Sequence, residues 1–359
     1  MSLQYTLLLL LFLAFFIHQS LANPHYQHAN FTATLFFGDS TLDTGNNEFI
    51  DSVFRSSHFP YGLDFPDRAA TGRFSDGLLV PDLLTSALNI KPLSPPWLDP
   101  GLSDEDIRTG VNFASAGAGL DDLTSAISNT VPLSRQLAMF REYAKRLEAA
   151  AGGEEEGRRV LENALVMFGA GGNDVIFNYY DLPSRRRKEF TTMSGYQDFL
   201  LGKLEDAVKN VYSHGCRRFI LTGLPPIGCL PVQMTAATFS DPPARECIDE
   251  QMADTHGYNT KLQNLLPKLQ QTLPGGKFAY LDITNTVLDM FNDPANGFEE
   301  TKRGCCGTGF IEMGPLCNHF TPLCENISSF AFFDAIHPTE RVYKMVTEHI
   351  MNNVIHKLY

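Results

Sequence analysis

The chain has 359 residues, 43% of which are hydrophobic, and its formal net charge at pH 7 is −13. This apolar content is sufficient for one large α/β domain or two small ones. The negative charge argues against a nucleic-acid partner, because the phosphates would be repelled rather than neutralised. We therefore expect an uncharged partner.

The first 22 residues predict a secretory signal peptide. An unbroken apolar stretch over residues 7–17 precedes the pattern Ser20-Leu21-Ala22, which is typical of a cleavage site. An uncleaved membrane anchor is the alternative, but a bilayer span needs roughly 20 apolar residues. We therefore expect cleavage after Ala22 and no transmembrane segment in the mature chain.

The remaining residues, 23–359, are expected to form a single catalytic domain that is secreted to the extracellular space. The C-terminus carries neither a retention signal nor a lipid-anchor signal. Two glycosylation acceptor tripeptides, which begin at Asn30 and Asn326, agree with the secretory route.

All seven cysteines follow the predicted signal peptide. In an oxidising compartment they allow up to three disulfides and leave one thiol over. No Cys-x-x-Cys pair is present, so structural disulfides are favoured over a metal site. We expect Cys229 to pair with Cys247, Cys305 or Cys306 to pair with Cys317 and Cys324, and Cys216 to be a buried free thiol.

Five short apolar runs predict five strands of a parallel sheet, at residues 34–37, 111–113, 165–168, 219–221 and 278–283. Helical spacing of apolar residues recurs between them, over residues 133–147, 196–212 and 258–269. Such helices would cover both faces of the sheet, which predicts a three-layer α/β/α sandwich. A final helix is expected to begin at Pro338, because proline is favoured in the first helical turn.

Polar and small residues follow the predicted strands, at the edge where open parallel sheets bind ligands. Ser40 follows the first run, in Gly38-Asp39-Ser40, and is a candidate nucleophile. Gly117 follows the second run, where small residues let a substrate approach backbone N–H groups. Asn173 follows the third run, and its side-chain amide can donate a hydrogen bond to developing negative charge. We therefore expect the oxyanion donors to be Ser40, Gly117 and Asn173.

Asp334 and His337 lie three residues apart, so a single turn can direct both side chains into one cleft. A neutral imidazole can accept the proton of a serine hydroxyl, and a carboxylate can orient that imidazole. We therefore expect Asp334, His337 and Ser40 to form a catalytic triad. Each motif alone also has a plain structural explanation, because Gly-Asp-Ser is often a turn and Asp-x-x-His a surface pair.

Taken together, and in this order, the motifs resemble those of the GDSL family of esterases and lipases, also called SGNH hydrolases, and its plant secreted branch in particular. Further matches are Gly72-Arg73-Phe74-Ser75-Asp76-Gly77, residues 224–231 and Cys305-Cys306-Gly307-Thr308-Gly309. The resemblance covers nearly all of the mature chain. It implies a flavodoxin-like SGNH hydrolase fold and a carboxylic ester hydrolase that acts on lipid or other acyl esters. It also implies the same roles for Ser40, Gly117, Asn173, Asp334 and His337.

Two other enzyme classes fit the sequence less well than an ester hydrolase, and two alternatives on the same fold stay open. A dinucleotide-binding enzyme is disfavoured, because the third glycine of its fingerprint would fall at Asp174. An ordinary α/β-hydrolase is disfavoured, because the chain has no Gly-x-Ser-x-Gly elbow. An acyltransferase that uses the same acyl-enzyme, and a catalytically silent binding or defence protein on the same fold, remain as alternatives. The expected ester chemistry needs no metal and no cofactor.

Overall fold

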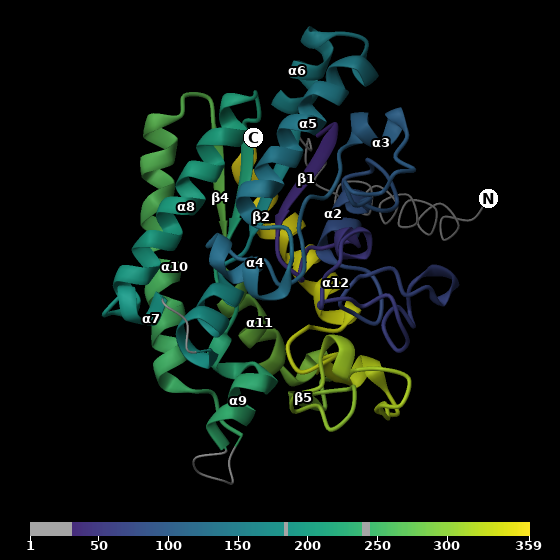
Figure 1. Ribbon diagram of the computed structural model, residues 1–359, viewed down its shortest axis with the longest axis vertical. Coiled ribbons are helices and arrows are strands. Elements are labelled where there is room, and N and C mark those ends of the chain that lie inside the picture. Colours follow the sequence, from purple (N-terminus) through teal and green to yellow (C-terminus); the bar gives the residue numbers. More distant parts are fainter. Residues whose placement is uncertain (1–30, 183–185, 239–244) are drawn as a thin grey trace, which may run out of the picture. The chain divides into compact units, whose positions relative to one another are not determined.

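A parallel sheet of four strands forms the core of the protein, in a computed structural model that describes residues 31–182, 186–238 and 245–359 (Figure 1). The strands are adjacent in chain order, β1 (Ala33–Gly38), β2 (Ala164–Gly169), β3 (Arg218–Thr222) and β4 (Lys277–Leu281). β1 and β2 are buried along their whole length. Residues Phe31–Tyr359 form one compact unit. The predicted signal peptide and Asn30 lie outside the described residues.

The predicted strand at residues 111–113 is wrong, because this segment forms isolated bridges rather than a strand. Asn112 lies beside Phe36 of β1, and the Phe113 N–H donates to the Phe36 carbonyl at 2.8 Å. The side chain of Asn112 bonds to two backbone groups, since its Oδ1 accepts the Ala114 N–H two residues on and its Nδ2 donates to the Leu42 carbonyl. A local bond such as that to Ala114 competes with a regular ladder. The sheet therefore has four strands, with this segment along the edge of β1.

Helices cover both faces of the sheet, as the sequence predicts. The helical patterns correspond to α5 (Leu133–Ala151), α8 (Met193–Ser213) and α10 (Asp249–Thr272), which pack side by side. Side chains alternate between the two faces of a strand. Phe37 packs against Phe140 of α5, whereas Thr34, on the opposite face of β1, bonds to Thr85 of α2 (Val80–Ala87). The second layer contains α2, α11 (Ile283–Asn292) and α12 (Glu340–His349).

Helix α12 begins at Glu340 and not at Pro338, so the expected start is wrong by two residues. Pro338 forms an antiparallel bridge with Phe332, and the Thr339 N–H donates to the Ala331 carbonyl. These contacts keep the backbone extended through Thr339, with φ −71° and ψ 159°. The first helical N–H group, that of Glu340, donates to Asp76 Oδ1 at 2.8 Å.

A second, two-stranded sheet, formed by β5 (Glu300–Gly304) and β6 (Phe330–Phe332), adjoins a disulfide-rich segment. The three disulfides are Cys229–Cys247, Cys305–Cys324 and Cys306–Cys317, and Cys216 is a buried free thiol, so the expected pairing is confirmed. Burial raises the pKa of the Cys216 thiol. The shorter helices are α3 (Asp104–Thr109), α4 (Asp122–Ser128), α6 (Glu154–Glu162), α7 (Arg186–Glu189) and α9 (Pro231–Thr238). No helix in the described ranges is long and apolar enough to cross a membrane.

Candidate active site

Ser40, His337 and Asp334 form one continuous chain of hydrogen bonds at the carboxyl end of β1. His337 Nε2 lies 2.8 Å from Ser40 Oγ, and His337 Nδ1 lies 2.7 Å from Asp334 Oδ2. The three side chains are buried, with 5% of His337 and 7% of Ser40 exposed. The structure therefore brings the three predicted residues together across 297 positions of sequence.

The turn that carries Ser40 is held by its neighbours. A Cβ atom at Gly38 would lie 2.1 Å from the Gly169 carbonyl oxygen, so only glycine allows this approach of β1 to β2. Asp43 accepts the N–H groups of Gly45, Asn46 and Ala116. Burial raises the pKa of Asp43 to about 6. The Asp43 side chain thus ties the loop after Ser40 to the loop that contains Gly117.

The short segment from Asp334 to His337 folds on itself. Asp334 Oδ1 accepts the backbone N–H groups of Ile336 and His337, at 2.8 and 2.7 Å. The Phe333 N–H donates to the His337 carbonyl at 2.8 Å. A Cβ atom at Gly304, the last residue of β5, would lie 2.5 Å from the Asp334 backbone. The sequence spacing therefore produces a closed turn that is packed against the second sheet.

Tyr61 is a third partner of Asp334 that sequence reasoning missed. Its hydroxyl donates to Asp334 Oδ2 at 2.7 Å and accepts the Gly314 N–H at 2.7 Å. Burial, and then the nearby Asp334 charge, raises the pKa of Tyr61 well above its usual value, which keeps the hydroxyl protonated as a donor. No local motif connects Tyr61 with a residue 273 positions away.

The motif from Gly72 to Gly77 contacts His337 and the helices α2 and α12. The Phe74 ring lies 4.7 Å from the His337 ring, centroid to centroid. Arg73 makes a buried bidentate ion pair with Asp82 in the first turn of α2, at 2.8 and 2.7 Å. Asp76 accepts the first N–H of α12. The motif thus connects the imidazole with the starts of two helices in the same layer.

The three expected oxyanion donors line one cavity together with His337. Neither the Ser40 N–H nor the Gly117 N–H has a hydrogen-bond partner among residues 31–182, 186–238 and 245–359. Asn173 Nδ2 donates to the Ala118 carbonyl at 2.9 Å, which engages one of its two amide hydrogens. Gly117 has φ +83°, and a Cβ atom there would lie 2.3 Å from the Phe54 ring.

Asp174, the residue after Asn173, anchors the loop that carries Gly117. Its carboxylate accepts the N–H groups of Leu120 and Asp121 and the hydroxyl of Thr124. Burial raises the pKa of Asp174 to about 7. Asn173 immediately precedes the π-helical segment Asp174–Asp181, so the same helix start positions the amide and fixes the loop that carries Gly117.

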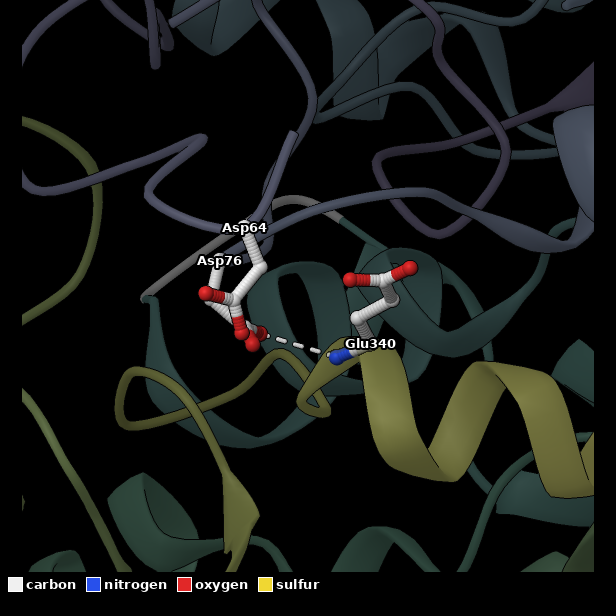
Figure 2. A group of neighbouring side chains, drawn as sticks. All are labelled: Asp64, Asp76 and Glu340. Atoms are coloured by element: carbon white, nitrogen blue, oxygen red, sulfur yellow. Dashed lines mark hydrogen bonds between the residues drawn. The ribbon is translucent and has the colours of Figure 1, made fainter. Parts of the chain in front are cut away.

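Figure 2 shows Asp64, Asp76 and Glu340, whose carboxylate oxygens lie within 4.8 Å of one another. Two of the three already have protein partners. Asp76 Oδ1 accepts the Glu340 N–H, and the Glu340 carboxylate pairs with Lys344 at 2.8 Å. Burial, with a smaller contribution from the Asp64 charge, raises the pKa of Asp76 to about 7. Within this group, Asp76 caps the start of α12.

Comparison with known proteins agrees with this geometry. Residues 35–350 match the sequence model of the family described as GDSL-like lipase/acylhydrolase. The chain is 49% identical to GDSL esterase/lipase At2g31540 of Arabidopsis thaliana over 342 residues, which cover 93% of this chain and 94% of the relative. It is 50% identical to GDSL esterase/lipase At2g31550 of the same plant over 318 residues, 88% of this chain and 87% of the relative. The chain therefore belongs to the GDSL esterase/lipase family and is a carboxylic ester hydrolase.

Proposed function

We propose that this protein is a secreted serine esterase that hydrolyses lipid or other acyl esters through an acyl-enzyme at Ser40. The observation that carries the proposal is the unbroken chain Ser40 Oγ, His337 and Asp334, beside the N–H groups of Ser40 and Gly117, which have no partner in the described part of the chain. The base His337 stands in hydrogen-bond reach of both the nucleophile and the orienting carboxylate, which is the arrangement that activates a serine.

In the proposed mechanism, Ser40 Oγ attacks the ester carbonyl while His337 Nε2 accepts its proton. The negative charge that develops on the carbonyl oxygen is stabilised by the N–H groups of Ser40 and Gly117 and by the Asn173 amide. His337 then gives its proton to the leaving alcohol. Water attacks the acyl-enzyme in the same way, with His337 as the base, and releases the acid and free Ser40.

Secretion is part of the proposal. The disulfides Cys229–Cys247, Cys305–Cys324 and Cys306–Cys317 favour an oxidising compartment. Asn326 of the second acceptor tripeptide is exposed, as glycosylation requires. The predicted signal peptide, residues 1–22, would supply the export signal.

The test is hydrolysis of p-nitrophenyl esters by the parent protein and by Ser40→Ala and His337→Ala. We expect each substitution to lower kcat by about 10⁴-fold or more. Ser56→Ala is the matched control, because Ser56 is also buried but its hydroxyl has no hydrogen-bond partner among the described residues. Full activity of Ser40→Ala, or a parent protein that hydrolyses no ester, would contradict the proposal.

Adding an acceptor alcohol to the same assay separates hydrolysis from acyl transfer. A hydrolase forms mainly free acid, whereas a transferase forms mainly the new ester from the same acyl-enzyme. If the new ester predominates, the protein is an acyltransferase rather than a hydrolase, and the roles of Ser40 and His337 are unchanged.

A further inference from the structure

Ser40 also lines a second and larger cavity, which lies against one face of the sheet. Ser40 and Asn173 line both this cavity and the smaller one that contains His337. The volume of the larger cavity is about 120 Å³, against about 20 Å³ for the smaller. The two cavities therefore meet at the reacting serine.

The larger cavity lies between the sheet and the layer formed by α2, α11 and α12. Met167 precedes Phe168 on β2, so its side chain points to the face opposite Phe37 and α5. Thr222 and Leu281 are paired in register on β3 and β4 and point to the same face. The cavity thus extends from the end of β1 to β4, three strand spacings away or about 14 Å.

The wall of the larger cavity is mainly hydrocarbon. Its apolar residues include Met167 and Leu281 on two strands of the sheet and Val287, Phe291, Val342 and Val346 on α11 and α12. Most of these side chains are fully or almost fully buried around the empty space. A long apolar pocket of this kind fits an aliphatic chain, because each methylene that it removes from water strengthens binding by up to about fourfold.

The position of His337 determines which half of an ester each cavity receives. The leaving alcohol oxygen takes its proton from His337 Nε2, so the alcohol half must lie on the side of the imidazole. His337 lines the smaller cavity, with Gly117 and Phe177, and is absent from the lining of the larger one. The acyl half, which stays on Ser40 after the alcohol leaves, must then occupy the larger cavity.

We propose that the larger cavity is the acyl-chain site and that the substrate is an ester of a medium-length or long aliphatic acid. This inference rests on the proposed esterase mechanism at Ser40. It assigns acyl-chain selectivity to the wall formed by α11 and α12, and alcohol selectivity to the smaller cavity.

The test uses p-nitrophenyl acetate, butyrate, octanoate and laurate with the parent, Val287→Phe and Val346→Phe. Val287 lies on α11 and Val346 on α12, and both line the larger cavity. We expect kcat/KM of the parent to rise from acetate to octanoate. Each larger side chain should lower the octanoate-to-acetate ratio of kcat/KM by about tenfold or more, because each ring fills space that several methylenes would occupy.

Two control variants separate filling the cavity from other effects. Thr222→Val keeps the volume of the side chain and removes a hydroxyl that has no partner among the described residues, so the acyl ratio should be unchanged or higher. Phe177→Ala enlarges the smaller cavity, so it should alter selectivity among alcohols without changing the acyl ratio. A second measurement on the parent alone compares esters lengthened on the acyl side with esters lengthened on the alcohol side, and only the acyl series should gain strongly.

Three results would overturn the inference. They are an unchanged acyl ratio in a folded Val287→Phe or Val346→Phe protein, a loss in Thr222→Val as large as theirs, or a parent that prefers acetate to octanoate. Because acetate does not need the deep cavity, its hydrolysis tests the Ser40 mechanism separately. If acetate is hydrolysed and Ser40→Ala is inactive, the esterase proposal stands even when the acyl-site proposal fails.

Discussion

Two buried carboxylates flank the start of α12, and their hydrogen-bond donors differ. Asp334 accepts four hydrogen bonds, from the Ile336 N–H, the His337 N–H, Tyr61 and the His337 imidazole. Asp76 accepts the Glu340 N–H and the Ser75 hydroxyl and lies close to the carboxylate of Asp64. Burial raises the pKa of Asp76 to about 7.

Depth of burial alone does not determine the role of a carboxylate. Both side chains are almost completely buried, at 0% exposure for Asp334 and 3% for Asp76. The donors around Asp334 fix its position and leave Oδ2 directed at His337, which suits an orienting residue. The few donors around Asp76 include the first N–H of α12, which suits a helix cap.

The largest contrast is expected from replacing each carboxylate with its amide. Asp334→Asn should lower kcat by between about 10² and 10⁴, because an amide cannot stabilise the imidazolium that forms during attack. Asp76→Asn keeps an oxygen for the Glu340 N–H and should retain kcat within about twofold. Steady-state ester hydrolysis checks both variants. Comparable losses of kcat in the two variants would contradict the different roles assigned to Asp334 and Asp76.

The next largest loss of kcat is expected at Asn173, because its amide is predicted to bind the oxyanion that forms only during the reaction. Asn173→Ala should lower kcat by about 10² to 10³ with little change in KM, because its amide would bind the oxyanion rather than the ground state. Kinetics with p-nitrophenyl butyrate provide the measurement. A rise in KM at constant kcat would instead place Asn173 in ordinary substrate binding.

A smaller effect is expected at Tyr61, which supplies one of the four donors to Asp334. Tyr61→Phe preserves the ring and removes one hydrogen bond while three other donors still hold Asp334, so kcat should fall by about tenfold or less, the effect of one typical hydrogen bond. KM should stay unchanged, because Tyr61 does not line either cavity at Ser40. A kcat equal to that of the parent would show that the remaining three donors position Asp334 without it.

Asp76→Asn should have the smallest effect on activity. It should, however, change how the free energy of unfolding depends on pH. The pKa of Asp76 in the folded chain, about 7, exceeds the usual value of 3.8. The folded state therefore binds more protons, and this stabilisation is complete below the usual pKa and is lost as pH rises through about 7. The free energy of unfolding of the parent, relative to Asp76→Asn, should fall by up to a few kcal/mol between about pH 4 and about pH 8. Urea unfolding at both pH values measures this difference, and a constant or rising difference would contradict the assigned pKa.

Residues at strand ends could be located from the sequence. Ser40 and Asn173 follow apolar runs that become β1 and β2, and Gly117 follows the segment beside β1. Asp334 and His337 are three residues apart, so one turn brings them together. Periodicity and spacing are local properties of the chain, which is why this part of the site could be predicted.

Features that depend on tertiary contacts could not be located in this way. Tyr61 meets Asp334 only after two distant segments pack together. The predicted strand at residues 111–113 forms only isolated bridges, and bridging at Pro338 delays the start of α12. The long cavity also requires knowledge of which strand faces point toward α11 and α12. No pattern along a single segment contains that information.

Covalent labelling tests whether Ser40 is the nucleophile and whether His337 activates it. The protein would be treated with a fluorophosphonate and its adduct located by peptide mass spectrometry. We predict one adduct per chain, on Ser40, with none on Ser40→Ala and much slower labelling of His337→Ala. An adduct on another serine, or continued ester turnover by a protein whose Ser40 is fully blocked, would contradict the account.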